Sequence, residues 1–280
     1  MAKANKLVKQ LARRGPHRVL KGDLGVAGLT GVVYTPEAGV NLPALAFAHD
    51  WLIPIKRYSR LFEHLASWGI VVAAPSTEGG PLPSDGRLAI DLGTALDIAT
   101  EVRLGVGEIT VNTRRRAVAG HGFGAGAALL AAGQEDVRSL AALFPAPTSP
   151  QALDAARSLE LPALLLAAAG DEKSLTSNAA QLAEAYGGDA RLRILPDGSA
   201  RGLAEGISAA GLLGAGKAHK PTQKAVRTLL TGFVLATAGA DEDYSEFAEP
   251  DTDLGDAIVW RPEDDPEPKT PSALDVIRGK

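Results

Sequence analysis

Between residues 29 and 237 the chain alternates short apolar runs with segments of helical spacing. The apolar runs are rich in Val, Ala and Leu and predict strands over 29–35, 43–49, 69–75, 116–121, 139–146, 161–170 and 190–196. Between these runs, apolar spacing and the Ala and Leu content predict helices over 57–68, 88–104, 123–134, 174–187 and 220–237. Near-continuous apolar strands are typical of a sheet covered on both faces. We therefore expect an α/β fold in which a mostly parallel sheet carries helices on both sides.

Charge divides the chain into three parts. Residues 1–21 carry seven Lys and Arg residues and no acid, whereas residues 241–268 carry twelve acids against a single Arg. We expect a basic N-terminal segment over 1–17, one α/β domain over 18–240, and an acidic tail with several prolines over 241–280. Such a tail is too polar to fold on its own and is expected to be extended. Only its apolar segment "AIVWRP" is expected to dock, on the parent domain or on a partner.

The basic start of the chain favours two interpretations. A short helix in residues 3–21 that carries Leu7, Val8 and Leu11 offers a weak contact for an anionic membrane. Because so few apolar residues anchor a helix poorly, the simpler interpretation is a solvated helix that pairs with the acidic tail. No nucleic-acid partner is expected. The sequence holds no signal-peptide pattern and no run of about 18 apolar residues, so we expect a cytoplasmic protein.

The residue types that are missing exclude several kinds of site. The chain has no Cys, which excludes disulfides, thiolate nucleophiles and thiolate-held zinc. No pair of histidines and no cluster of carboxylates has the spacing of metal ligands. We expect neither a metal nor a cofactor.

One motif points to a candidate site. The predicted strand 116–121 runs into Gly120-His121-Gly122-Phe123-Gly124, and a predicted helix follows directly. A strand, a small-x-x-x-small turn and a helix are typical of the nucleophile elbow G-x-S-x-G, whose tight turn needs small flanking residues. Gly120 and Gly124 meet that need. Gly122 stands at the position of the serine, so the motif lacks a nucleophile.

Three further stretches carry a family resemblance. They are "AFAHDW" at the end of strand 43–49, "LLLAAAGDEKS" at the end of strand 161–170, and the longer run "RYSRLFEHLASWGIVVAAPSTEG" over residues 57–79. With the elbow, their order resembles the α/β-hydrolase superfamily, in its dienelactone hydrolase, chlorophyllase and cutinase-like branch, over residues 18 to 237. The resemblance implies an α/β-hydrolase fold and puts Asp171 at the position of the catalytic acid. It also implies oxyanion-hole donors at the N–H groups of Trp51 and Phe123.

The position of the catalytic histidine departs from the family. The relatives carry a histidine after the last strand, in a phrase such as "DGASH", whereas this chain reads "LPDGSARGLAEG". Ala200 or Arg201 therefore fills that place. His219 follows well beyond the loop and is the one candidate for a displaced base. His49 and His121 end two predicted strands and are expected to hydrogen-bond neighbouring loops.

Without serine or histidine, the resemblance implies a catalytically impaired protein. We expect a pocket that holds an acyl or carboxylate ligand without cleaving it, or a surface for a protein partner. The expected ligand-binding residues are Asp50, Trp51, Ser76, His121 and Phe123. The alternative is an active esterase or dienelactone-type hydrolase that uses Asp50, Ser76 or His219 instead of the usual triad.

Nucleotide binding is a weaker alternative. The run "GHGFGA" also fits G-x-G-x-x-G/A between a strand and a helix, although the next predicted strand ends without an acid for the ribose. The run "GLLGAGKA", residues 211–218, is one residue short of a phosphate-binding P-loop and has Ala218 where that motif needs Ser or Thr. We expect this run to be a loop.

Overall fold

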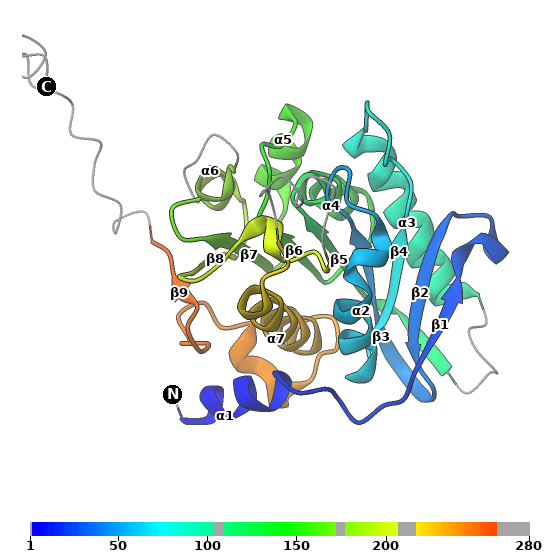
Figure 1. The fold of residues 1–280 in the computed structure, drawn as a ribbon, viewed down its shortest axis with the longest axis horizontal. Coiled ribbons are helices and arrows are strands. Elements are labelled where there is room, and N and C mark those ends of the chain that lie inside the picture. Colours follow the sequence, from blue (N-terminus) through cyan, green and yellow to red (C-terminus); the bar gives the residue numbers. More distant parts are fainter. Residues whose placement is uncertain (1, 103–108, 172–176, 207–216, 262–280) are drawn as a thin grey trace, which may run out of the picture.

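The computed structural model describes residues 2–102, 109–171, 177–206 and 217–261 of the 280-residue chain. At its centre lies a nine-stranded sheet with the order β1-β2-β4-β3-β5-β6-β7-β8-β9 (Figure 1). Strands β4, β3, β5, β6, β7 and β8 run parallel to one another, whereas β1, β2 and β9 pair antiparallel with their neighbours. The bounds are β1 Val19–Asp23, β2 Gly31–Pro36, β3 Gly39–Ala48, β4 Val71–Pro75, β5 Ile109–His121, β6 Ser139–Leu143, β7 Ala163–Ala168, β8 Ala190–Leu195 and β9 Ile258–Val259. The predicted α/β fold with a mostly parallel sheet is confirmed.

Helices cover both faces of the sheet. One face carries α1 (Ala2–Leu11), α2 (Ser59–Ser67) and α7 (Lys220–Ala236), and the other carries α3 (Asp85–Glu101), α4 (Phe123–Gln134), α5 (Pro150–Ser158) and α6 (Ala179–Ala185) (Figure 1). Successive strand residues point to opposite faces. In β5, Ala117 and Ala119 therefore join the core under α2 and α7, while Val118 joins the core under α3 and α4. Within the described residues, none of the helices combines the length and the hydropathy needed to cross a membrane.

The predicted strands appear as β2 to β8 and the predicted helices as α2, α3, α4, α6 and α7. Some bounds are shorter: β6 ends at Leu143 because Phe144 turns the chain with φ 49°. The start of the predicted helix 174–187 falls partly outside the described residues, and α6 begins at Ala179. The sequence did not predict β1, β9, α5 or the first half of β5.

The described part of the acidic tail is not extended, which corrects the expectation for residues 241–261. A short 3-10 helix, η5 (Glu242–Phe247), packs under α7, with Phe247 buried against Gly232. Ile258 and Val259 form β9 and close the edge of β8. The guanidinium of buried Arg193 donates to the carbonyl oxygens of residues 249, 250 and 252, at 2.9–3.5 Å. Backbone pairing and this clamp hold a segment that its composition alone would leave loose.

The N-terminal helix and the described acidic segment meet at α7, where α1 lies beside α7 and η5 (Figure 1). The apolar face of α1 (Ala4, Leu7 and Leu11) is buried in the core, and Lys3 pairs with Glu246 at 2.9 Å. The expected pairing between the basic start and the acidic segment is therefore present. Because the apolar face of α1 already packs inward, a membrane contact of residues 3–21 would depend on charge alone.

Candidate functional site

The motif Gly120–Gly124, called the elbow below, forms the turn between β5 and α4. Gly122 has φ 55° and ψ −117°, a conformation that residues with a side chain rarely adopt. A Cβ on Gly120 would lie 1.9 Å from the carbonyl oxygen of Gly124, and a Cβ on Gly124 would lie 2.5 Å from that of Ala48. Both flanking positions therefore need glycine for strand and helix to approach. The strand, turn and helix lie where the sequence places them.

Asp50 fills the space in front of the elbow. One oxygen of its carboxylate, Oδ1, accepts hydrogen bonds from the backbone N–H groups of Trp51 and Phe123, each at 2.8 Å. A Cβ on Gly122 would lie only 2.2 Å from that oxygen. The two N–H groups expected to form an oxyanion hole thus converge on one point, and the chain's own carboxylate occupies that point. Asp50, Trp51, Gly122 and Phe123 are called the Asp50 site below.

The carboxylate also completes the start of α4. Phe123 is the first residue of this helix, and Gly122 has no side chain with which to cap it. The N–H groups at the start of a helix lack partners inside the helix, and the helix dipole favours negative charge there. Asp50 supplies both the missing acceptor and the charge.

Strained backbone surrounds this site. Leu52, Glu78 and Phe144 have positive φ values of 59°, 56° and 49°, although none of them is glycine. They follow β3, β4 and β6, and Gly122 follows β5 between them. Residues in such conformations cost about 1–3 kcal/mol each and are concentrated at functional sites. Residues with positive φ values therefore follow four neighbouring strands at this edge of the sheet.

A buried hydrogen-bonded chain ties the Asp50 site to the loop after β8. The N–H of Asp50 donates to the hydroxyl of Tyr58 at 3.1 Å, and that hydroxyl lies 2.8 Å from Nδ1 of His121. Nε2 of His121 lies 3.0 Å from the carbonyl oxygen of Ala200. Burial lowers the pKa of His121, and burial raises the pKa of Tyr58 well above its ordinary value. Both groups are therefore neutral near pH 7.

Neutral side chains satisfy every donor and acceptor in this series of hydrogen bonds. Tyr58 accepts from the backbone and donates to Nδ1 of His121, which leaves the hydrogen of the imidazole on Nε2, where it donates to the carbonyl of Ala200. His121 is thus fully occupied as a structural link and has no free nitrogen for acid–base chemistry. The sequence placed His121 near the pocket but missed Tyr58, whose partners come from two distant segments.

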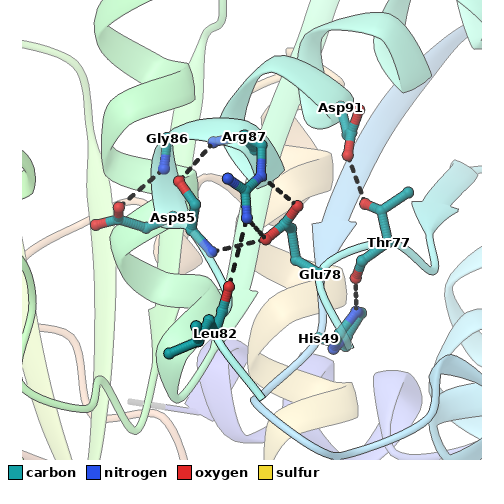
Figure 2. Close-up of polar contacts among 9 residues, drawn as sticks. His49, Thr77, Glu78, Leu82, Asp85, Gly86, Arg87 and Asp91 are labelled. Atoms are coloured by element: carbon teal, nitrogen blue, oxygen red, sulfur yellow. Dashed lines mark hydrogen bonds and ion pairs between the residues drawn. The ribbon is translucent and has the colours of Figure 1, made fainter. Parts of the chain in front are cut away.

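The segment after β4 closes one side of the site. The ring nitrogens of buried His49 lie 2.8 Å from the carbonyl oxygens of Asp50 and Thr77. The hydroxyl of Thr77 donates to Asp91 at 2.5 Å, and Figure 2 shows both contacts of Thr77. Farther along, the carboxylate of Glu78 binds the guanidinium of Arg87 at 2.7 and 2.8 Å (Figure 2). These bonds fix the loop between β4 and α3 to the start of α3.

The remaining predicted residues stand apart from the Asp50 site. Ser76 follows β4, which β3 separates from the elbow strand, and its N–H binds Thr30. Asp171 lies in the turn after β7, beyond β6. Arg201 is exposed in the 3-10 helix η3 (Ala200–Gly202), beside the buried link to His121. His219 precedes α7, and its Nδ1 lies 2.8 Å from the hydroxyl of Thr222.

Exposed apolar side chains lie on the two segments that follow β3 and β4. Trp51 and Leu52 follow β3 and are 45% and 61% exposed, and Leu82 in the loop after β4 is 86% exposed. The indole N–H of Trp51 donates to the carbonyl of Gly80 at 3.0 Å, which holds the ring against that loop. The described residues contain no group of three or more His, Asp or Glu side chains placed to hold a metal.

The described geometry can hold an anion but cannot activate a nucleophile at the elbow. The motif "GHGFGA" does form a strand–turn–helix, yet the N–H of Phe123 that would meet a phosphate already binds the carboxylate of Asp50. Most of the P-loop-like run 211–218 lies outside the described residues. No protein-family model matches the chain, and a search of curated proteins finds no significantly similar sequence, so the α/β-hydrolase relationship remains a resemblance.

Proposed function

We propose that this chain is an α/β-hydrolase-like protein that does not cleave esters and acts by binding. The observation that carries the proposal is the position of Asp50, whose Oδ1 accepts from both Trp51 and Phe123. A hydrolase holds these donors ready for the oxygen that becomes negative in the transition state. Here a carboxylate oxygen of the protein occupies that place, so a substrate carbonyl would have to displace it to reach the hole.

The hydrolase relationship is supported by how the motifs meet. The elbow is a strained strand–turn–helix, and the second N–H of the hole comes from the loop after β3, as the nucleophile-elbow arrangement requires. The loop after β8, which in the relatives carries the histidine, lies beside the elbow through the bond between His121 and Ala200. Its residues here, Ala200 and Arg201, have no group that removes a proton near pH 7.

The alternative of an active hydrolase meets two obstacles. Asp50 cannot both fill the oxyanion hole and attack a carbonyl whose oxygen needs the same two N–H groups. Ser76 lies beyond β3 from the elbow, and a serine without a positioned base is a poor nucleophile. A nucleotide is disfavoured because the carboxylate of Asp50 would repel a phosphate at the start of α4.

Two kinds of binding partner fit the site, and each has one supporting observation. The exposed side chains of Trp51, Leu52 and Leu82 favour a protein partner that contacts these two segments. The two N–H groups, which already bind a carboxylate oxygen at 2.8 Å, favour an acyl or carboxylate ligand. Such a ligand must displace Asp50 from the two N–H groups. Because Asp50 belongs to the same molecule, its effective concentration there is high. We therefore place the protein partner first.

The test of the proposal measures hydrolysis of p-nitrophenyl acetate and butyrate by the full chain. The wild type, Asp50→Ala, Ser76→Ala and His219→Ala should all show the background rate. Turnover by the wild type that disappears in one variant would establish an active enzyme and overturn the proposal.

A second measurement separates the two partners. We expect butyrate, titrated by calorimetry, to bind Asp50→Ala but neither the wild type nor Asp50→Asn, because an Asn oxygen still accepts from both N–H groups. Butyrate binding by the wild type would instead favour the carboxylate ligand. Failure of butyrate to bind Asp50→Ala would show that the vacated hole does not recognise carboxylates.

A further inference from the structure

A cavity of about 490 Å³ lies away from the Asp50 site, between α1 and α7. It is lined by residues from the end of α1, the first three turns of α7, the loop after β8 and the turn at residues 254–257. This volume is within the range of small-molecule pockets. The cavity is called the α1–α7 pocket below.

The floor of the pocket is apolar. Along α7, Pro221, Ala225 and Leu229 follow one another at intervals of four residues and so lie on one side of the helix. Val8 of α1 and Leu254 of the turn line the pocket with them. A hydrocarbon chain placed along this row would be removed from water over about two helical turns.

The entrance at the start of α7 is cationic. Lys220 and Lys224 line the pocket one turn apart, and Lys9 of α1 lines it from the other helix. All three are exposed, and within the part of the chain that the structure describes none of them has an ion-pair partner. The pocket therefore carries unpaired positive charge next to an apolar row.

The two lysines of α7 are placed against the preferences of a helix. The first turn of α7 contains no acid, His219 gives it no side-chain cap, and the helix dipole makes this end positive. Like charges four residues apart at the positive end lower the stability of the helix. Positions that break a local rule without a visible gain in stability are expected at functional sites. An anion bound here would offset the repulsion.

We infer that the α1–α7 pocket binds a small amphiphilic anion, with a carboxylate or phosphate head at Lys220 and Lys224 and an apolar tail along Pro221, Ala225 and Leu229. Two acids, Asp197 and Asp256, also line the pocket, from the loop after β8 and from the turn. The three lysines outnumber these two acids, and the head group is assigned to Lys220 and Lys224 because they lie at the positive end of α7. The inference does not depend on the Asp50 site.

Calorimetry of the full chain with four probes tests this site. Decanoate and decyl phosphate, used below their micelle concentrations, combine head and tail, while decanol lacks the charge and inorganic phosphate lacks the tail. We expect one molecule of either anion to bind and both partial probes to bind at least about tenfold more weakly. The double variant Lys220→Gln/Lys224→Gln should lose about tenfold in affinity or more.

Matched variants locate the effect. Lys6→Gln/Arg13→Gln removes the same charge from exposed residues that do not line the pocket and should change the affinity less than about twofold. Ala225→Trp fills the apolar row and should abolish binding, with thermal unfolding as the check that it folds.

Several outcomes would overturn the inference. They are equal affinity for decanol and decanoate, equal affinity of the two double variants, and no binding of either anion up to its solubility. Sedimentation with phosphatidylglycerol vesicles tests one more outcome. If the chain binds the vesicles but not monomeric decyl phosphate, the lysines form a membrane-facing surface and not a pocket for one molecule.

Discussion

If Asp50 occupies the space that a side chain at position 122 needs, the effects of changing the two residues on stability must be coupled. Gly122→Ala puts a Cβ at φ 55°, which costs about 1–3 kcal/mol in backbone strain. That Cβ would also lie 2.2 Å from Oδ1 of Asp50, so the carboxylate must leave and both of its hydrogen bonds break. A hydrogen bond contributes about 1 kcal/mol net, so the two bonds together contribute about 2 kcal/mol. We expect a total loss of about 3–5 kcal/mol.

In the background of Asp50→Ala, those bonds are already absent. Gly122→Ala should then cost only its backbone strain, about 1–3 kcal/mol, and the two changes should show a coupling of about 2 kcal/mol. Urea unfolding of the four proteins, followed by circular dichroism, measures this cycle. Ser76→Ala replaces Asp50→Ala in the control cycle, because Ser76 lies beyond β3, and should be additive with Gly122→Ala. Additivity within about 0.5 kcal/mol in the Asp50 cycle would refute the reasoning.

Four further predictions concern single residues. Burial lowers the pKa of His64 from 6.5 to about 4, so the unfolded chain takes up the proton first, and stability present above pH 6.5 falls as the pH drops towards 4. The loss at pH 5 is about 2 kcal/mol, and urea unfolding of His64→Leu should lack it; the same pH profile in both proteins would contradict this. Asp50→Ala should lower the free energy of unfolding by about 1–2 kcal/mol, and Asp50→Asn by less than half as much. An unchanged free energy of unfolding in Asp50→Ala would show that the carboxylate does not stabilise the start of α4. Gly122→Ser should leave ester hydrolysis at background, and turnover would mean that a base lies nearby. Arg193→Leu should speed hydrogen exchange of the backbone amides of residues 249–259, and unchanged exchange would show that β9 alone holds them.

The interior strands were predictable because burial on both faces leaves continuous apolar runs. β1 lacks that signal, since Lys21, Gly22 and Asp23 are exposed. β9 is two residues long and depends on pairing with β8 rather than on its own composition. In α5 only Ala152 and Ala156 are buried, and such small residues give too little apolar periodicity to reveal a helix. The packing of residues 241–261 depends on buried Arg193, whose partners are distant carbonyl groups.

The candidate site was also predictable only in part. Motif order was enough to bring Asp50, Trp51 and Phe123 to one edge, because the carboxyl ends of neighbouring parallel strands meet there. The direction of the Asp50 side chain was not predictable, since it depends on two N–H groups from different segments and on the absence of a side chain at Gly122. Tyr58 was missed for a similar reason, as its hydroxyl joins Asp50 to His121 only in the folded chain.

The contact between Asp50 and Phe123 spans 73 positions of the chain and joins the end of β3 to the start of α4. A working oxyanion hole must keep such donors available until a substrate arrives, and unpaired donors lower the stability of the folded state. Filling the hole removes that conflict between stability and activity. A serine at Gly122 would have to displace the carboxylate of Asp50 from both N–H groups, so the substitution that supplies a nucleophile to the elbow would lower the stability of the folded state.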